Sequence, residues 1–179
     1  MATMDVPTYD PVAVAPFRQQ LNDVGFRDLL TPEEVDQALA AEGVTLVVLN
    51  SVCGCSAGSA RPGVGAALQN SRIPDHLVAM FAGQEKSAVS HFRSKYIPHV
   101  AASSPNIALF KDGEFVAILE RAHIQQMDAD EIAEALAKAF DELCTKPGPS
   151  IPLADYERLE FARSCGSKIA RVDGGPGSC

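Results

Sequence analysis

Two short runs of apolar residues dominate the first half of the chain. Residues 44–49 and residues 77–82 are nearly uninterrupted and rich in branched or aromatic side chains. Runs of this length without strict alternation are typical of strands buried on both faces of a sheet. Apolar residues at helical spacing fill the segments 12–30, 31–42 and 84–96. The pattern therefore predicts two helices and a strand, then a second strand followed by a further helix.

Helix start and stop signals refine these boundaries. The first helix is expected to end near Gly25, and residues 31–34 (Thr-Pro-Glu-Glu) supply an N-cap, a first-turn proline and a capping-box glutamate for the second helix. Small residues dominate the segment 53–68 between the two strand runs. We expect a helix there that bends at Pro62, because proline removes a backbone hydrogen bond and crowds the carbonyl one turn earlier.

The second half of the chain predicts a hairpin and a closing helix. An Asp-Gly pair lies between the apolar runs 107–110 and 115–119, which is a hairpin signal. Either Asp128 or Asp130 is expected to cap an amphipathic helix that reaches Cys144. The order of elements predicts an α/β, thioredoxin-like fold, with a central mixed sheet, helices on both faces and an extra N-terminal helix.

Composition changes after Cys144, where the ordered core is expected to end. Prolines and glycines indicate a linker near residues 147–152 and a flexible end to the chain. One short helix is expected within residues 153–163. The chain is thus predicted to comprise a domain of residues 1–144 and a Pro/Gly-rich tail of residues 145–179.

Charge and hydropathy exclude several classes of partner. The 179 residues include 23 acidic and 15 basic side chains, for a formal net charge of −8, and the basic residues form no cluster. Nucleic acid and anionic membrane surfaces are therefore not expected as partners. No apolar run approaches the roughly 18 residues that span a bilayer, and the N-terminus has no signal-peptide pattern. The expected location is the cytoplasm.

Five cysteines stand out in a chain expected to be intracellular. An odd number in a reducing compartment disfavours a disulfide scaffold and favours thiol chemistry or metal binding. Cys53 lies between a predicted strand and a predicted helix, where free backbone N–H groups and the helix dipole favour the thiolate. This placement lowers a thiol pKa from about 8.5 by one or more units and is expected to leave Cys53 partly exposed. Cys53 is therefore the predicted nucleophile.

Cys55 follows two residues later and is the candidate resolving thiol. Gly54 between the two offers the backbone freedom that a disulfide across one residue needs. Such a small ring is expected to be strained and easily reduced, which suits transient exchange. Three alternatives stay open from the residues alone: a monothiol mechanism, cysteines that only pack, and a metal site of Cys53, Cys55, Cys165 and Cys179.

Two further positions are candidates for substrate binding. Ser104-Pro105 directly precedes a predicted strand, where a cis peptide would face the cysteine loop and offer backbone groups to a bound thiol. Arg61 is a candidate for pairing with a substrate carboxylate, and a solvated arginine on a helix face is the alternative. The four histidines show no ligand spacing and, like Cys144, are expected to be surface or structural residues. No metal or cofactor is predicted.

The segment around the cysteines resembles the bacilliredoxin family. Residues 50–58 read Asn-Ser-Val-Cys-Gly-Cys-Ser-Ala-Gly, and residues 60–62 read Ala-Arg-Pro. The similarity extends over about residues 5–144, with further matching segments at residues 81–86, 103–105 and 139–144. By this resemblance the chain is expected to adopt a thioredoxin-like fold with a Cys-Gly-Cys motif.

The resemblance implies a thiol-disulfide oxidoreductase that removes bacillithiol, or another low-molecular-weight thiol, from S-thiolated client proteins. Cys53 would attack the mixed disulfide, release the client thiol and hold the small thiol until Cys55 or another thiol clears it. A recycling reductase is the third implied partner. A general protein disulfide isomerase or reductase is the alternative enzyme, and a Cys-based metal or iron-sulfur binding module is the alternative outside enzymes. The tail departs from the family, and Cys179 is either an extra resolving thiol or part of a terminus without function.

Overall fold

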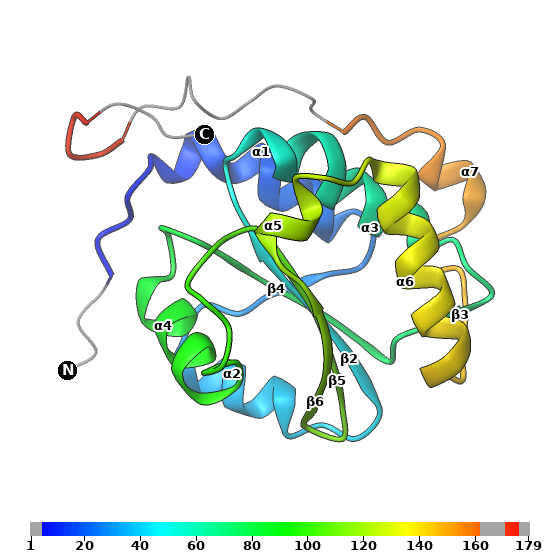
Figure 1. Ribbon diagram of the computed structural model, residues 1–179. Coiled ribbons are helices and arrows are strands. Elements are labelled where there is room, and N and C mark those ends of the chain that lie inside the picture. The colour runs from blue at the N-terminus through cyan, green and yellow to red at the C-terminus, as the bar shows by residue number, and fades with distance from the viewer. Residues whose placement is uncertain (1–4, 162–170, 176–179) are drawn as a thin grey trace.

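A central five-stranded sheet organises the chain (Figure 1). The computed structural model describes residues 5–161 and 171–175. The strands lie in the order β1-β4-β2-β5-β6, with bounds β1 Arg27–Asp28, β4 His76–Phe81, β2 Val44–Asn50, β5 Asn106–Lys111 and β6 Glu114–Leu119. β4 runs parallel to β2, and β5 runs antiparallel to both β2 and β6. This is the mixed sheet of a thioredoxin-like fold, as predicted.

β2 forms the centre of the sheet, and all seven of its residues are buried. Val47 lies opposite Val78 of β4 on one side and Ala108 of β5 on the other. Side chains alternate along a strand, so Leu46 and Leu49 face opposite sides of the sheet and enter two separate apolar clusters. The uninterrupted apolar run in the sequence reflects this burial on both faces.

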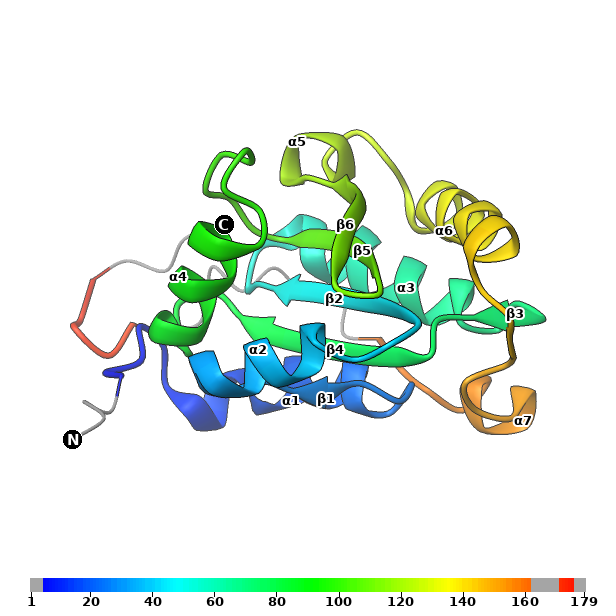
Figure 2. The same ribbon diagram turned by 90° about the horizontal axis from the view of Figure 1, so that it is seen from below.

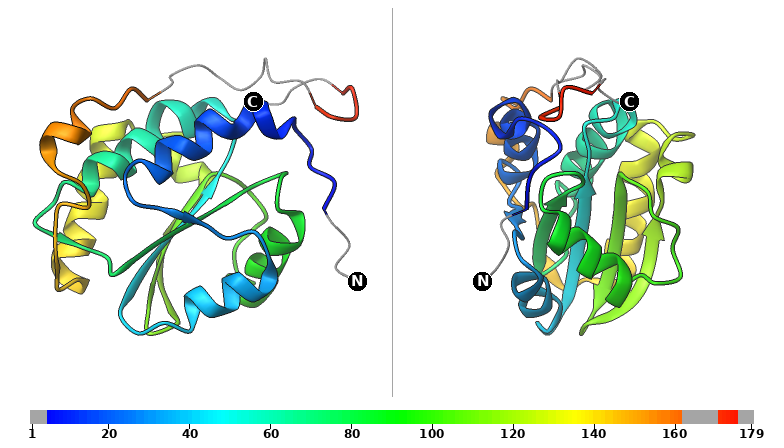
Figure 3. Two further views of the ribbon diagram at one scale, coloured as in Figure 1. Left: turned by 180° about the vertical axis from the view of Figure 1, so that it is seen from behind. Right: turned by 90° about the vertical axis from the view of Figure 1, so that its left-hand side faces the viewer.

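Helices cover both faces of the sheet, as predicted (Figures 2 and 3). One face packs against α1 (Pro11–Asn22), α3 (Arg61–Ala67) and α6 (Ala129–Leu143). The other face packs against α2 (Pro32–Leu39) and α4 (Lys86–Lys95). None of the helices in the described part of the chain has the length and apolar composition to cross a bilayer.

Capping signals in the sequence identify two helix starts correctly. Thr31 Oγ1 accepts a hydrogen bond from the backbone N–H of Glu34 at 3.2 Å, directly before α2. Asp128, rather than Asp130, caps α6, because its Oδ1 accepts from Glu131 N at 2.8 Å. The Glu131 side chain accepts in return from Asp128 N at 2.9 Å. Such reciprocal bonds satisfy donors that the start of a helix leaves free.

The turn between β5 and β6 is the predicted Asp-Gly hairpin. Asp112 and Gly113 have φ values of 51° and 80°, and a two-residue turn of type I′ requires positive φ at both positions. A Cβ on Gly113 would also lie 2.6 Å from the carbonyl oxygen of Leu39, so glycine is required there.

The edge strand β1 and the short helix α5 (Arg121–Ile124) were not predicted from the sequence. Gly25, with a φ of 109°, turns the chain after α1 so that residues 27–28 pair in parallel with β4. Phe26 and Leu29 flank this strand and are buried, although their spacing matched a helix. A strand of two residues is too short to produce an alternating pattern.

The helix after the cysteines is irregular. A π-helical turn, η1 (Ser56–Ala60), leads directly into α3. Pro62 lies in the first turn of α3, and the helical segment runs through it without a break from the π-helical turn. The irregularity is a wide turn that contains Gly58 and directly precedes the proline. Turns of this kind are frequent at functional sites.

The chain beyond Cys144 packs onto the domain, which corrects the expectation that the ordered core ends there. β7 (Lys146–Pro147) pairs antiparallel with β3 (Arg72–Ile73), and α7 (Leu153–Tyr156) is the predicted short helix, reduced to one turn. Four partly buried side chains pack against the apolar cluster that α3 and α6 share: Ile151, Tyr156, Leu159 and Phe161. The composition of this segment suggested a linker, but its apolar residues bury surface of the core.

Candidate active site

The turn after β2 fixes Cys53 through its backbone. Cys53 N donates to Ser51 Oγ at 3.1 Å, and Cys53 O accepts from the backbone N–H groups of Ser56 and Ala57 at 3.1 and 3.2 Å. The predicted position between a strand and a helical segment is confirmed. Cys53 is only 3% exposed, so the expectation of a partly exposed thiol is wrong. Segments from elsewhere in the chain line the pocket beside Cys53.

The sulfur atoms of Cys53 and Cys55 lie 2.6 Å apart, within hydrogen-bond distance. Burial opposes the thiolate of Cys53, but three hydrogen bonds and a guanidinium outweigh it and hold its pKa below the ordinary thiol value. The donors are the Cys55 thiol, the Ser56 N–H and the Ser51 hydroxyl, and the guanidinium is that of Arg121. Burial and the neighbouring Cys53 raise the pKa of Cys55 to about 11. Of the two thiols, Cys53 therefore has the lower pKa and forms the thiolate more readily than Cys55.

The predicted substrate-binding residues differ in whether they line the pocket beside Cys53. The Ser104-Pro105 peptide is cis, as the sequence predicted. Ser104 and Cys53 line the same pocket of about 330 Å³, whereas Pro105 is buried and does not line it. Gly54 is half-buried and has no positive φ, so the conformational freedom of glycine is not used there. A role of these residues in substrate binding stays a prediction.

Arg61 is a buried structural residue, which corrects both roles considered for it. Its side chain is 0% exposed, so it reaches neither a substrate nor the solvent. The guanidinium donates to four acceptors: Gln20 Oε1 at 2.7 Å, Asn50 Oδ1 at 3.0 Å, Ser51 O at 2.9 Å and Ser56 Oγ at 3.0 Å. Burial lowers the pKa of Arg61 to about 10, which leaves it charged at neutral pH. Arg61 thus ties α1 and the end of β2 to the turn that carries the cysteines.

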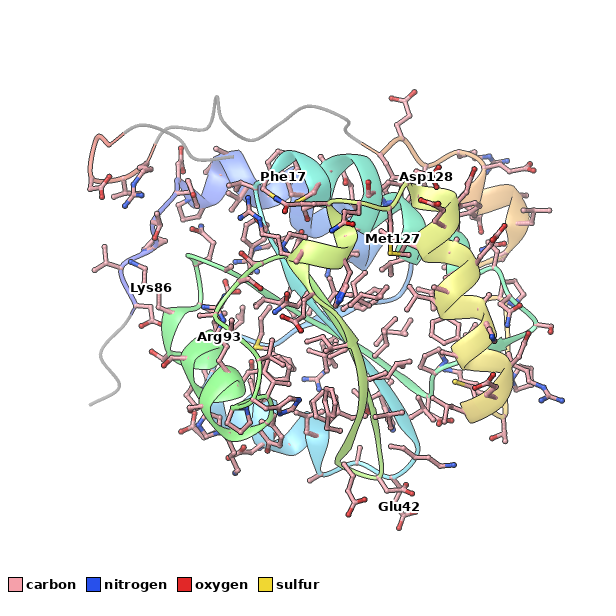
Figure 4. All side chains as sticks on the ribbon, in the orientation of Figure 1. Phe17, Glu42, Lys86, Arg93, Met127 and Asp128 are labelled. Atoms are coloured by element: carbon pink, nitrogen blue, oxygen red, sulfur yellow. The ribbon has the colours of Figure 1, made fainter. Side chains whose placement is uncertain are left out.

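Three arginines that the sequence analysis missed line the pocket beside Cys53. Arg93 comes from α4 (Figure 4), Arg121 is the first residue of α5, and Arg171 belongs to the C-terminal segment. The other lining residues include no aspartate, glutamate or lysine: Thr8, Tyr9, Ser51, Val52, Cys53, Ala82, Gly83 and Ser104. The three arginines share no spacing in the sequence, and only the fold brings them together.

The four histidines make structural contacts, as predicted. Their partners are Glu42 O for His76, Asp36 for His91, the Phe115 ring for His99 and Glu120 N for His123. Cys144 is buried in the core, and burial raises its pKa to about 11. A protonated, covered thiol is inert, so Cys144 has the predicted packing role.

Residues 5–161 and 171–175 contain no group of three or more His, Cys, Asp or Glu side chains arranged to hold a metal ion. Cys165 and Cys179, which the alternative metal site would need, lie outside the described residues. The alternative in which Cys179 acts as an extra resolving thiol lies outside them as well.

Comparison with known proteins identifies relatives of the region that carries this site. The family model described as "Disulphide isomerase" matches residues 9–144. A bacilliredoxin of Cytophaga hutchinsonii is 46% identical over 135 residues, which cover 75% of this chain and 99% of that protein. A bacilliredoxin of Halalkalibacterium halodurans is 46% identical over 143 residues, which cover 79% of this chain and 99% of that protein.

Among solved structures, the thioredoxin-like domain of Arabidopsis NCP is 18% identical, with a TM-score of 0.45 over 68% of this chain and 81% of that one. The family match and the bacilliredoxin relatives support a thiol-disulfide oxidoreductase. With a family model that covers residues 9–144 and relatives 46% identical over three quarters of its length, the chain belongs to the bacilliredoxin family.

Proposed function

We propose that this protein reduces mixed disulfides between protein cysteines and a low-molecular-weight thiol, such as bacillithiol, through Cys53. The observation that carries the proposal is a thiolate-favouring cysteine in the wall of a small pocket of about 330 Å³. A cavity of this size suits a small thiol. A buried sulfur is hard to reach for a disulfide in the interior of a folded protein.

The first step is an exchange at the sulfur of the small thiol. The Cys53 thiolate attacks that sulfur, a bond forms between the two, and the disulfide bond to the client breaks. The client cysteine leaves as a thiolate and takes a proton from water. Cys53 then carries the small thiol as a mixed disulfide, and the client is reduced.

The second step uses Cys55, whose reactivity depends on the state of Cys53. In the free pair, the hydrogen bond and charge of Cys53 are two causes that raise the pKa of Cys55. Both are removed when Cys53 enters a disulfide, so the pKa of Cys55 falls at that point. Cys55 then loses its proton and attacks Cys53 Sγ, which releases the small thiol and forms the Cys53–Cys55 disulfide. A recycling reductase supplies the two electrons that restore both thiols.

General disulfide isomerisation or reduction on protein substrates is the second candidate function, favoured by the description of the matching family model. The 3% exposure of Cys53 argues for the small thiol as the species that enters the site. Turnover of S-bacillithiolated client without turnover of scrambled protein disulfides is the expected result. We propose the cytoplasm as the location, with S-thiolated clients as the protein partners.

Intact-mass spectrometry of the reduced protein after exposure to an S-bacillithiolated client tests the proposal. An adduct of one small thiol is expected to accumulate in Cys55→Ala and to be lost in Cys53→Ala. Cys144→Ala is the matched control, because it also removes one thiol but from a buried position outside the pocket. An adduct that survives in Cys53→Ala would assign the chemistry to another cysteine and reject the proposed mechanism.

A further inference from the structure

The pocket beside Cys53 differs in charge from the rest of the molecule. The chain carries a formal net charge of −8, yet three arginines and no aspartate or glutamate line this pocket. The arginines come from three separate segments and lie at the same cavity as the nucleophile. Such a concentration of positive charge attracts anions in solution.

Arg93 and Arg121 have no carboxylate to neutralise them within the described residues. Arg93 Nη2 donates to Ser103 O at 2.8 Å, and Arg121 Nη1 donates to Ser104 O at 3.4 Å. Arg93 Nε is buried and has no hydrogen-bond partner in the described part of the chain. An unmatched donor on a charged group is costly to bury, and a bound carboxylate would satisfy it with a charge-assisted hydrogen bond.

Arg171 reaches the pocket because the C-terminal segment joins the N-terminal segment beside it (Figure 1). Val172 N donates to Thr8 O at 2.8 Å, and Tyr9 and Arg171 form an isolated antiparallel bridge. Thr8 N in turn donates to Gly83 O at 2.6 Å, which fixes both segments at the edge of the pocket.

Asp173 forms an ion pair with Arg171 at this edge and orients its guanidinium. It accepts two hydrogen bonds, from Arg171 Nε at 3.0 Å and from Arg171 Nη2 at 2.9 Å. Because the family model ends at residue 144, Arg171 is an addition outside the matched family region.

We propose that Arg171 is a specificity-determining residue that, together with Arg93 and Arg121, binds the carboxylates of the small thiol processed at Cys53. The proposal rests on the proposed function and names its substrate class, a thiol with one or more carboxylates. The C-terminal segment thereby completes a binding site whose chemistry is built by the family domain. A neutral or cationic thiol of the same size gains nothing from these three guanidiniums.

Competitive alkylation of Cys53 in the reduced protein tests the charge preference without any client. Iodoacetate is anionic and iodoacetamide is neutral, and both react with the same thiolate, so the ratio of their rates cancels any change in thiol pKa. Arg171→Gln is expected to lower the iodoacetate-to-iodoacetamide ratio at Cys53 by about threefold, the scale of one partly exposed ion pair. High salt is expected to lower the wild-type ratio as well.

Arg158→Gln is the matched control, because Arg158 also follows residue 144 and its side chain is 80% exposed and outside the pocket. Arg171→Lys keeps the charge and is expected to keep most of the ratio. If Arg171→Gln gives the same iodoacetate-to-iodoacetamide ratio as Arg158→Gln, Arg171 does not act on the anion. If Arg171→Lys lowers the ratio as much as Arg171→Gln does, the effect comes from disruption of the C-terminal segment. Either result overturns the inference.

Turnover of one client protein carrying either mercaptosuccinate or 2-mercaptoethanol separates this inference from the proposed function. The inference expects faster reduction of the mercaptosuccinate adduct and loss of that preference in Arg171→Gln. Equal rates for both adducts in the wild type would overturn the inference and leave the function intact. Failure to reduce either adduct would reject the proposed function, and the alkylation ratio would still decide whether Arg171 selects anions.

Discussion

Replacement of Arg61 by methionine tests whether the buried guanidinium holds the cysteine turn in place. Methionine is long and flexible enough to fill much of the space, so the change removes hydrogen bonds and charge without a large cavity. Asn50 Oδ1 keeps donors in Ser51 N and the Ser56 hydroxyl, at 2.9 and 3.1 Å. Gln20 Oε1 and Ser51 O lose the bond that Arg61 donates to them, so two buried acceptors are left without it.

The magnitude follows from these two acceptors. An unsatisfied buried polar group costs about 1–3 kcal/mol, so the pair costs about 2–6 kcal/mol. Removal of a buried charge that has no carboxylate partner returns part of its desolvation free energy. We expect Arg61→Met to lower the free energy of unfolding by about 3 kcal/mol, a large share of the 5–15 kcal/mol typical of a domain.

Urea unfolding at equilibrium, followed by circular dichroism, measures this loss. With a slope of about 2 kcal/mol per molar urea, the midpoint is expected to fall by about 1.5 M. Arg158→Met, at an exposed position, is the control and is expected to change stability by less than about 0.5 kcal/mol. An Arg61→Met protein as stable as the wild type would refute the reasoning that this network stabilises the fold.

Three further predictions concern the two thiols, the contact between α3 and α6, and the cap of α6. Alkylation of Cys53 is expected to reach half its maximal rate at a pH below the ordinary thiol pKa. In Cys53→Ser the pKa of Cys55, measured as its alkylation rate against pH, is expected to fall below about 11. An unchanged pKa of Cys55 would contradict the coupling between the two thiols. Gly63→Ala is expected to lower the free energy of unfolding by about 1–3 kcal/mol, because a Cβ there would lie 2.8 Å from a side chain of α6. Gly58→Ala is the control in the same urea assay, because a Cβ there meets nothing within 4 Å. Asp128→Ala removes the cap of α6 and is expected to lower the free energy of unfolding by about 1 kcal/mol, measured by thermal unfolding. Asp128→Asn is expected to stay close to the wild-type stability, because asparagine also caps helices.

Elements with a strong local signal could be predicted from the sequence. The run that forms β2 is apolar on both faces because both faces are covered, and the Asp112-Gly113 pair satisfies a turn that needs two positive φ values. β1 gave no such signal, because two residues of edge strand carry no period. The packing of segment 145–161 could not be predicted, because prolines dominate its local pattern and the burial of its scattered apolar residues depends on the surface of α3 and α6.

The site could be predicted only where its chemistry is local. Cys53 and Cys55 follow directly from the end of an apolar run, so their position at a strand end was evident. The burial of Arg61 was not, because its acceptors come from α1, β2 and η1, which meet only in three dimensions. Arg93 and Arg121 escaped notice for the same reason, since neither lies within 25 residues of a cysteine at the site.

The attachment of the Arg171 segment has a consequence for how such a protein can change during evolution. Arg171 stands on backbone that a bridge to Tyr9 and a hydrogen bond to Thr8 attach to the N-terminal segment, outside the central sheet. Surface substitutions outside a core usually change stability by less than about 0.5 kcal/mol, so selection can vary this segment while the nucleophile and its supports stay fixed. By the proposal that Arg171 selects the thiol, a lineage can redirect the reaction at Cys53 toward a different thiol by altering this appendage, without redesigning the domain that performs it.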